Sequence, residues 1–282
     1  MHKRFYLISA VIVSLFACPS FAAETAEEAG DQGDGTKFSI ADFTFRVGFY
    51  DISSSTKIRV DALGGLIGTT IDLENDLNLD ETKSTSYLSV GWRMSGRHHL
   101  ELEQFKLSRS GLETLSAQIE FGDQVFDIGA TVNSFFETKI TRLSYSYVVR
   151  DTEKSMVALS AGLHRTSLAV GISDIMANFN ADPVAIAEAT APLPVIGVDA
   201  GWKFNERWSI TGRAQIFRLK IAEYSGRLNH ATVRIEYDPF KYVGFGVGYD
   251  MFSMGLDIER DLWNGSVTYS FQGPLAYVKG HF

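Results

Sequence analysis

The sequence is short of three things: cysteine, long apolar runs and positive charge. A single cysteine, Cys18, rules out an internal disulfide. Beyond residue 23 no apolar run approaches the roughly eighteen residues of a membrane-spanning helix. The chain carries 26 Lys and Arg against 34 Asp and Glu, a net charge of −8, so it lacks the basic surplus of nucleic-acid-binding proteins. We therefore expect neither a helical membrane protein nor a nucleic-acid partner.

The first 23 residues have the layout of a secretory signal peptide. Residues 2–4 are basic, residues 5–17 are almost wholly apolar, and residues 20–22 offer a small-x-small cleavage site. Thirteen apolar residues are too few to cross a bilayer as a helix. The pattern predicts export through the general secretory pathway and removal of residues 1–23 by signal peptidase.

Cys18 leaves an alternative open. Residues 15–18 resemble a lipoprotein box, in which Cys18 would be lipidated, although Phe16 and Pro19 fit that motif poorly. If ordinary cleavage occurs instead, the mature chain contains no cysteine. A thiolate nucleophile and a cysteine metal site are then excluded.

The rest of the chain divides into a short leader and one large domain. Residues 24–37 are acidic and glycine-rich and have no apolar periodicity, which predicts a flexible leader. From residue 38 to residue 282 the dominant pattern has a period of two. Phe45 and Val47, for example, alternate with Arg46 and Gly48. Successive side chains of a β-strand point to opposite faces, so we expect an all-β domain over residues 38–282.

Strand length and loop asymmetry favour an antiparallel up-and-down transmembrane β-barrel over a soluble sandwich. Several segments exceed the 9–11 residues needed to cross a bilayer, and short turns alternate with long links. We expect about ten strands, near residues 43–54, 84–94, 97–109, 134–149, 154–170, 193–204, 207–222, 226–238, 241–256 and 263–282. Eight or twelve strands are alternatives, because residues 112–132 could form a hairpin above the membrane or two further spanning strands. Apolar positions change phase at 273–274, where we expect a β-bulge, and at Gln104 and 216–217, which are either bulges or strands that protrude beyond the bilayer.

The last strand ends on an aromatic residue, Phe282, with Gly280 and Val278 at two-residue steps before it. With this ending and its alternating strands, the chain resembles the small outer-membrane β-barrel proteins of Gram-negative bacteria, the loosely defined "outer membrane protein beta-barrel" group. The resemblance implies a location in the outer membrane, contact with its lipids and periplasmic placement of both chain ends. It also implies that Phe282 is the signal for the barrel-assembly machinery. It supplies no catalytic residue, and we expect a monomer.

If the apolar faces meet lipid, the opposite faces line the lumen. We therefore expect charged residues of both signs in the barrel interior: Arg46, Arg93, Glu101, Glu103, Arg142, His164, Asp199, Arg213, Arg234, Glu236 and Asp250. A ten-stranded barrel has a narrow lumen. We interpret the set as a structural network of arginine–carboxylate pairs, or alternatively as a narrow path for small polar solutes.

Other patterns carry weaker chemistry. Residues 72–81 are rich in oxygen donors but lack calcium-loop spacing, and we expect no metal and no cofactor. Residues 171–192 are apolar and could form a short helix, a packing surface or a contact for an apolar solute. Gly244, Gly246 and Gly248 share one strand face, where a large neighbouring side chain could take the space.

Three functional hypotheses follow from this sequence. The first is a narrow channel or transporter-like barrel for small solutes. The second is a structural or surface-interaction barrel with a closed lumen. The third is an outer-leaflet lipid or peptide hydrolase with His164 as its base near the outer rim, although the pattern favours a non-enzymatic protein.

Overall fold

The computed structural model describes residues 5–6, 41–61, 68–175, 185–221, 224–260 and 263–282. Apart from the two-residue strand β1 (Phe5–Tyr6), the predicted signal peptide, Cys18 and the leader 24–37 lie outside the described residues. No helix among the described residues is long and apolar enough to cross a membrane.

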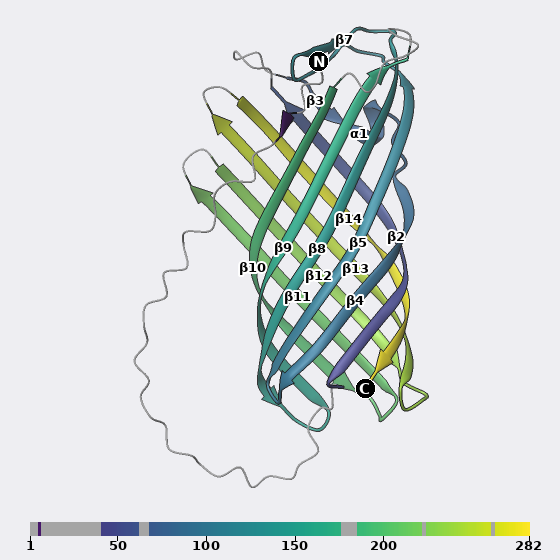
Figure 1. The fold of residues 1–282 in the computed structure, drawn as a ribbon, viewed down its shortest axis with the longest axis vertical. Coiled ribbons are helices and arrows are strands. Elements are labelled where there is room, and N and C mark those ends of the chain that lie inside the picture. The colour runs from purple at the N-terminus through teal and green to yellow at the C-terminus, as the bar shows by residue number, and fades with distance from the viewer. Residues whose placement is uncertain (1–4, 7–40, 62–67, 176–184, 222–223, 261–262) are drawn as a thin grey trace.

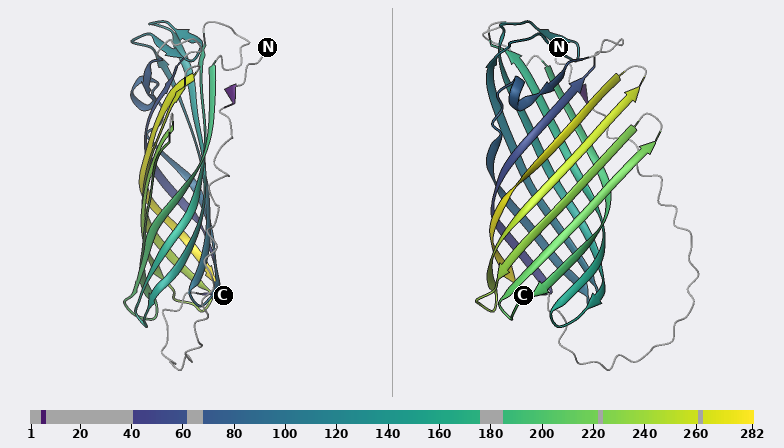
Figure 2. Two further views of the ribbon diagram at one scale, coloured as in Figure 1. Left: turned by 90° about the vertical axis from the view of Figure 1, so that its left-hand side faces the viewer. Right: turned by 180° about the vertical axis from the view of Figure 1, so that it is seen from behind.

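The chain folds into a closed barrel of ten antiparallel strands (Figures 1 and 2), which confirms the predicted fold. In ring order the strands are β2 (Phe43–Val60), β4 (Thr82–Ser95), β5 (His98–Thr114), β8 (Thr131–Asp151), β9 (Ser155–Asp174), β10 (Ala185–Lys203), β11 (Trp208–Ile221), β12 (Tyr224–Tyr237), β13 (Val243–Arg260) and β14 (Trp263–His281). Pairing of β14 with β2 closes the ring. Because ring order follows sequence order, the topology is up-and-down. We call the end that holds Phe282 and the short turns the turn end, and the opposite end the loop end.

The outer surface carries an apolar band around its turn-end half. Phe49 of β2, Leu163 of β9 and Met251 of β13 are exposed apolar side chains on this surface. The next outward residues toward the loop end are polar, for example Asp51 and Arg165. Strands of 14 to 21 residues are longer than the 9–11 that a bilayer requires, so they extend beyond the band at the loop end.

Residues 171–192, expected to be a long link, belong largely to the barrel wall. Residues 171–174 continue β9, and residues 185–192 form the start of β10, paired with each other in unbroken register. A short helix is therefore the wrong interpretation for the described part of this segment, while Met176, Phe179 and Val184 lie outside it. Strand β1 lies outside the ring and pairs in parallel with β10 at Ala187 and Glu188.

The bulge predicted at 273–274 is wrong, and at Gln104 and 216–217 the structure shows strands that extend beyond the apolar band rather than bulges. The registers of β5 with β8, β11 with β12 and β13 with β14 run without a shift through Gln104, 216–217 and 273–274. Register shifts occur instead in the pairing of β4 with β5 and of β8 with β9, both at the turn end. The apolar residues that are out of phase with the outward-facing ones, such as Phe105 and Phe271, point into the barrel, where they are buried. The interior is thus polar in one half and aromatic in the other.

The loop end is covered by two segments that cross the mouth. One contains β3 (Thr70–Asp72), paired with β2, and the four-residue helix α1 (Leu73–Asp76). The other is a hairpin of β6 (Ile119–Phe121) and β7 (Gln124–Phe126), the alternative predicted for residues 112–132. The amide of Thr69 donates to the carbonyl of Glu120 at 3.0 Å, which joins the two segments into one cover.

Candidate functional site

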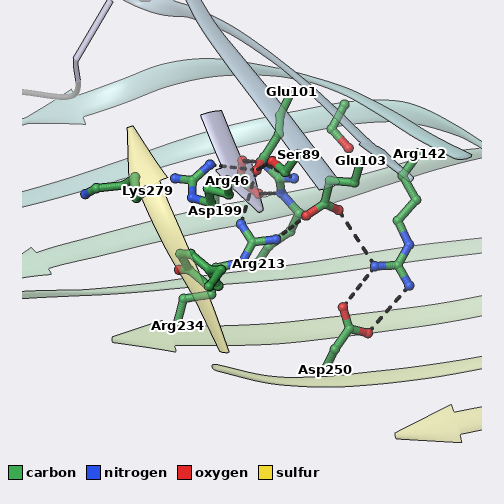
Figure 3. A network of polar contacts seen from close by, with 12 residues as sticks. Arg46, Ser89, Glu101, Glu103, Arg142, Asp199, Arg213, Arg234, Asp250 and Lys279 are labelled. Atoms are coloured by element: carbon green, nitrogen blue, oxygen red, sulfur yellow. Dashed lines mark hydrogen bonds and ion pairs between the residues drawn. The ribbon is translucent and has the colours of Figure 1, made fainter. Parts of the chain in front are cut away.

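A connected charge network fills the turn-end half of the lumen (Figure 3). Its centre is Glu101 of β5, whose carboxylate contacts three guanidinium groups: Arg213 at 2.8 Å, and Arg46 and Arg234 at 3.2 Å each. Inward-facing strand positions bring these side chains together from β2, β5, β11 and β12. Charge-assisted pairs of this kind compensate for the loss of solvation, because each buried charge has several partners.

Asp199 of β10 is held at one side of this network. Arg213, its direct cross-strand neighbour, donates to both carboxylate oxygens at 2.9 and 3.1 Å. The hydroxyl groups of Ser146 and Ser160 donate to the same carboxylate at 2.5 and 3.2 Å. Four hydrogen bonds from three side chains therefore fix Asp199, which leaves little freedom for a bound solute to displace it.

Arg142 of β8 extends the network across the lumen. It donates to Asp250 of β13 at 2.9 Å and lies 3.7 Å from Glu103 of β5. Glu103 also pairs with Arg234 and accepts a hydrogen bond from Tyr87 at 2.7 Å. Arg142, Glu103 and Asp250 are only 1–3% exposed, so this layer is closed to solvent.

Nearer the turn end, Glu236 of β12 is the acceptor for several donors. Lys279 of β14 contacts it at 2.7 Å, Tyr277 at 2.9 Å and Arg46 at 3.0 Å. Lys279 and Tyr277 were not among the predicted lumen residues. The signal was present, because both alternate with the outward Val278, but the supposed bulge at 273–274 concealed which face they occupy.

Arg93 is separate from this network. It lines a cavity of about 430 Å³ at the turn end, together with Lys203, Lys279 and His281. The network residues Arg46, Glu101 and Arg213 form the inner lining of the same cavity. Ten of the eleven predicted lumen residues thus lie in or beside the closed part of the interior, and Arg93 lies at its mouth.

The structure places His164 in mid-barrel, not at the outer rim as expected. Its ring is fully buried, and its Nε2 atom lies 2.9 Å from the amide oxygen of Gln215. The centroid of the ring lies 5.3 Å from that of His230. Among the described histidines, none lies at the loop end: His98, His99 and His281 lie near the turn end. The hydrolase hypothesis therefore loses its candidate base.

An aromatic layer covers the charge network on the side of the loop end. Its members are Tyr50, Phe105, Phe136, Phe252, Tyr269 and Phe271, all at most 3% exposed. The Arg142 guanidinium lies 5.4 Å from the Phe105 ring and 5.5 Å from the Phe252 ring, which are cation–π distances. Layers of charge and of aromatic rings therefore meet at Arg142.

The cover at the loop end has its own buried ion pair. Glu74 of α1 contacts Arg109 of β5 at 2.5 Å and accepts from the amide of Thr56 at 2.7 Å. Arg109 also donates to the Thr56 hydroxyl at 2.7 Å. Partial burial opposes ionisation of Asp72, the N-cap of α1, but hydrogen bonds from Asn75 together with the neighbouring Lys57 lower the pKa of this carboxyl. The acidic run 72–81 thus anchors the cover, and the described residues contain no metal-binding cluster.

The three glycines of β13 make room for large neighbours, as expected. A side chain at Gly246 would overlap the Tyr277 ring, and one at Gly248 would come within 3.1 Å of the Arg234 side chain. Phe282 is exposed and joins the ring closure, since its amide and carbonyl both pair with Phe43 at 3.0 and 3.2 Å. Its role in membrane insertion stays a prediction.

No protein-family model and no curated protein sequence matches the chain. Among solved structures it is similar to the outer membrane protease OmpT of Escherichia coli, with 11% identity, a TM-score of 0.53, and coverage of 85% of this chain and 96% of that one. Weaker similarities include the Pseudomonas putida toluene transporter TodX (10% identity, TM-score 0.35, 87% and 91% covered) and the Yersinia pestis attachment protein Ail (8%, 0.32, 84% and 97%). At these identities the similarity establishes the outer-membrane β-barrel fold alone.

Proposed function

We propose that this protein is a monomeric barrel of the Gram-negative outer membrane whose lumen is closed. Its function is then that of a structural or surface-interaction barrel, with contacts made at the loop end, and not that of an open pore. The observation that carries this proposal is the buried layer formed by Arg142, Glu103 and Asp250. The apolar outer band supports the membrane placement, because hydrocarbon solvates exposed aromatic and aliphatic side chains that water would not.

A narrow channel is the second candidate. The turn-end cavity favours it, since charged side chains line a path inward as far as Glu101. Beyond that point an ion would have to displace Arg142 from two carboxylates and then pass an aromatic layer. Breaking a buried ion pair costs about 3–5 kcal/mol, so a resting lumen stays closed.

Conductance in planar bilayers separates the two. We expect no steady conductance from the wild-type barrel. Replacing both Arg142 and Asp250 by Ala removes the bridging side chains without leaving either charge unpaired, and we expect a measurable leak. Arg93→Ala is the matched control, because Arg93 lies at the mouth and should leave the barrel silent. Steady wild-type conductance whose ion selectivity changes in Arg93→Ala would establish the channel instead.

A further inference from the structure

The ring of strands is closed near the turn end, but toward the loop end β10 and β11 are not paired with each other. Their pairing runs from Lys203 and Ser209 to Ile196 and Ile216, and ends there. Beyond this point β10 pairs with β9 as far as Ala185, and β11 pairs with β12 as far as Ile221. The two strands diverge toward the loop end in Figures 1 and 2. We call this stretch of unpaired strand edges the cleft. Within the described residues, its β10 edge is met only by β1, which belongs to the segment predicted to be removed on export.

Two prolines account for the end of the pairing. The amide of Lys203 donates toward β9, to Lys154, whereas the amide of Phe204 donates toward β11, to Trp208. The backbone N–H and C=O groups of even-numbered β10 residues therefore point toward β11. Pro192 and Pro194 lack an N–H at two of these positions, so the ladder cannot continue there.

The cleft begins where the apolar band ends. Ile196 and Ile216 are exposed apolar residues on the outer face at the end of the paired region, 67% and 52% exposed, and beyond them lie Pro194 on β10 and Arg218 on β11. Inside hydrocarbon every backbone group needs a partner, and here unpaired edges appear only above the band. The cleft thus opens at the level expected for lipid headgroups.

The interior beside the cleft is apolar. The inward residues of β10 along it are all small or aliphatic: Ala185, Ala187, Ala189, Ala191, Leu193 and Val195. Phe217, the first inward residue of β11 past the paired region, packs against the same apolar cluster. A cavity of about 780 Å³ reaches Ala214 and Ile216 at this edge, but its lining also contains the carboxylates of Asp72, Glu74 and Glu81. An apolar chain that stays against the inward face of β10 could enter without displacing these charges.

Positive charges gather on the outer face at the same edge. Arg218 of β11 and Arg227 of β12 are direct cross-strand partners, and Lys220 is two residues farther along β11. All three are exposed, and in the described part of the chain no carboxylate forms an ion pair with them. Like charges directly opposite destabilise a strand pair, and a bound anion would relieve the repulsion.

We propose that the cleft binds a phosphate-bearing lipid of the outer leaflet: Arg218, Lys220 and Arg227 contact the phosphate, and an acyl chain enters the apolar interior between β10 and β11. The inference rests on the proposed membrane location but not on the closed lumen. Phosphate, rather than carboxylate, suits three clustered cations because it presents several acceptor oxygens. The position of the cations at the headgroup level favours a lipid over a soluble anion.

Native mass spectrometry of the detergent-extracted barrel tests this site with diphosphorylated lipid A as the probe. We expect the barrel to retain lipid A and to lose it when the probe is dephosphorylated. Replacing Arg218 and Arg227 by Gln should weaken retention at least about tenfold, because each substitution removes a charge-assisted hydrogen bond. Lys139→Gln is the matched control, because Lys139 is an exposed cation on β8, separated from the cleft by strands β9 and β10.

A second variant tests entry of the chain. Ala191→Trp fills the inner side of the cleft and should reduce retention, whereas Thr190→Trp, its outward neighbour, should not. Unchanged retention in Ala191→Trp would overturn chain entry, and equal binding of dephosphorylated lipid A would overturn the phosphate contact. Complete competition by inorganic phosphate would show a soluble-anion site and overturn the lipid proposal. Because detergent-extracted protein is used, all these outcomes are independent of whether the barrel conducts ions.

Discussion

Arg142 and Asp250 form an ion pair across the full width of the barrel. Their strands, β8 and β13, are five places apart in a ring of ten, and the guanidinium donates to the carboxylate at 2.9 Å. Arg234 of β12 and Glu103 of β5 bridge the lumen in the same way. The network therefore ties opposite walls together and does not merely line them.

The first prediction concerns this bridge. Arg142→Ala leaves Asp250 and Glu103 buried with fewer partners, so we expect a loss of about 3–5 kcal/mol in the free energy of unfolding. Guanidinium unfolding in detergent micelles measures it. Adding Asp250→Ala to the same chain should recover part of the loss. Additive effects of the two substitutions would contradict a direct coupling between these residues.

The second prediction concerns the glycine face of β13. Gly246→Val would force a side chain into the Tyr277 ring, and we expect about 1–3 kcal/mol of destabilisation from this overlap. Gly212→Val is the control, since the nearest atom to a side chain there is a carbonyl oxygen 3.7 Å away. Thermal unfolding in micelles compares the two variants. Equal melting temperatures would mean that Tyr277 does not need the space.

The third prediction concerns the cover at the loop end. Glu74→Ala leaves Arg109 buried and without its carboxylate, so the cover should open more often. We expect faster amide hydrogen exchange in residues 70–79 and faster proteolysis there, with the barrel strands unchanged. Glu137→Ala is the control, because it breaks an exposed ion pair with Lys106 that contributes about 1 kcal/mol or less. Equal protection in both variants would contradict an anchoring role for Glu74.

The alternation of side chains was enough to predict ten strands and most of the charged interior. Inward Arg46, Glu101 and Asp250 follow directly from outward neighbours such as Val47, Leu102 and Met251. The aromatic layer was missed because the change of phase at Phe105 and Phe271 was interpreted as a bulge or a protruding strand, and not as aromatic side chains turned inward. A period of two fixes which residues share a face, but it does not say which solvent that face meets.

The cleft shows a second limit of the sequence. The cleft was not predicted: Pro192 and Pro194 are compatible with a strand that has one unpaired edge, but the pattern alone does not tell which neighbour is lost. That depends on the backbone phase of β10, which is visible only once Lys203 and Phe204 have hydrogen-bond partners. The position of His164 in mid-barrel depended similarly on the length of β9, which extends to Asp174.

Both proposals depend on hydrocarbon surrounding the apolar band. Trp92 and Trp202 are about half exposed on this band, which makes their fluorescence a direct probe of it. The measurement is quenching by phospholipids brominated on their acyl chains, in vesicles reconstituted with the purified barrel. If hydrocarbon surrounds the band, we expect strong quenching of the tryptophan fluorescence, and less quenching when both tryptophans are replaced by Phe. Unquenched fluorescence from a protein that stays monomeric in buffer without detergent would contradict this expectation.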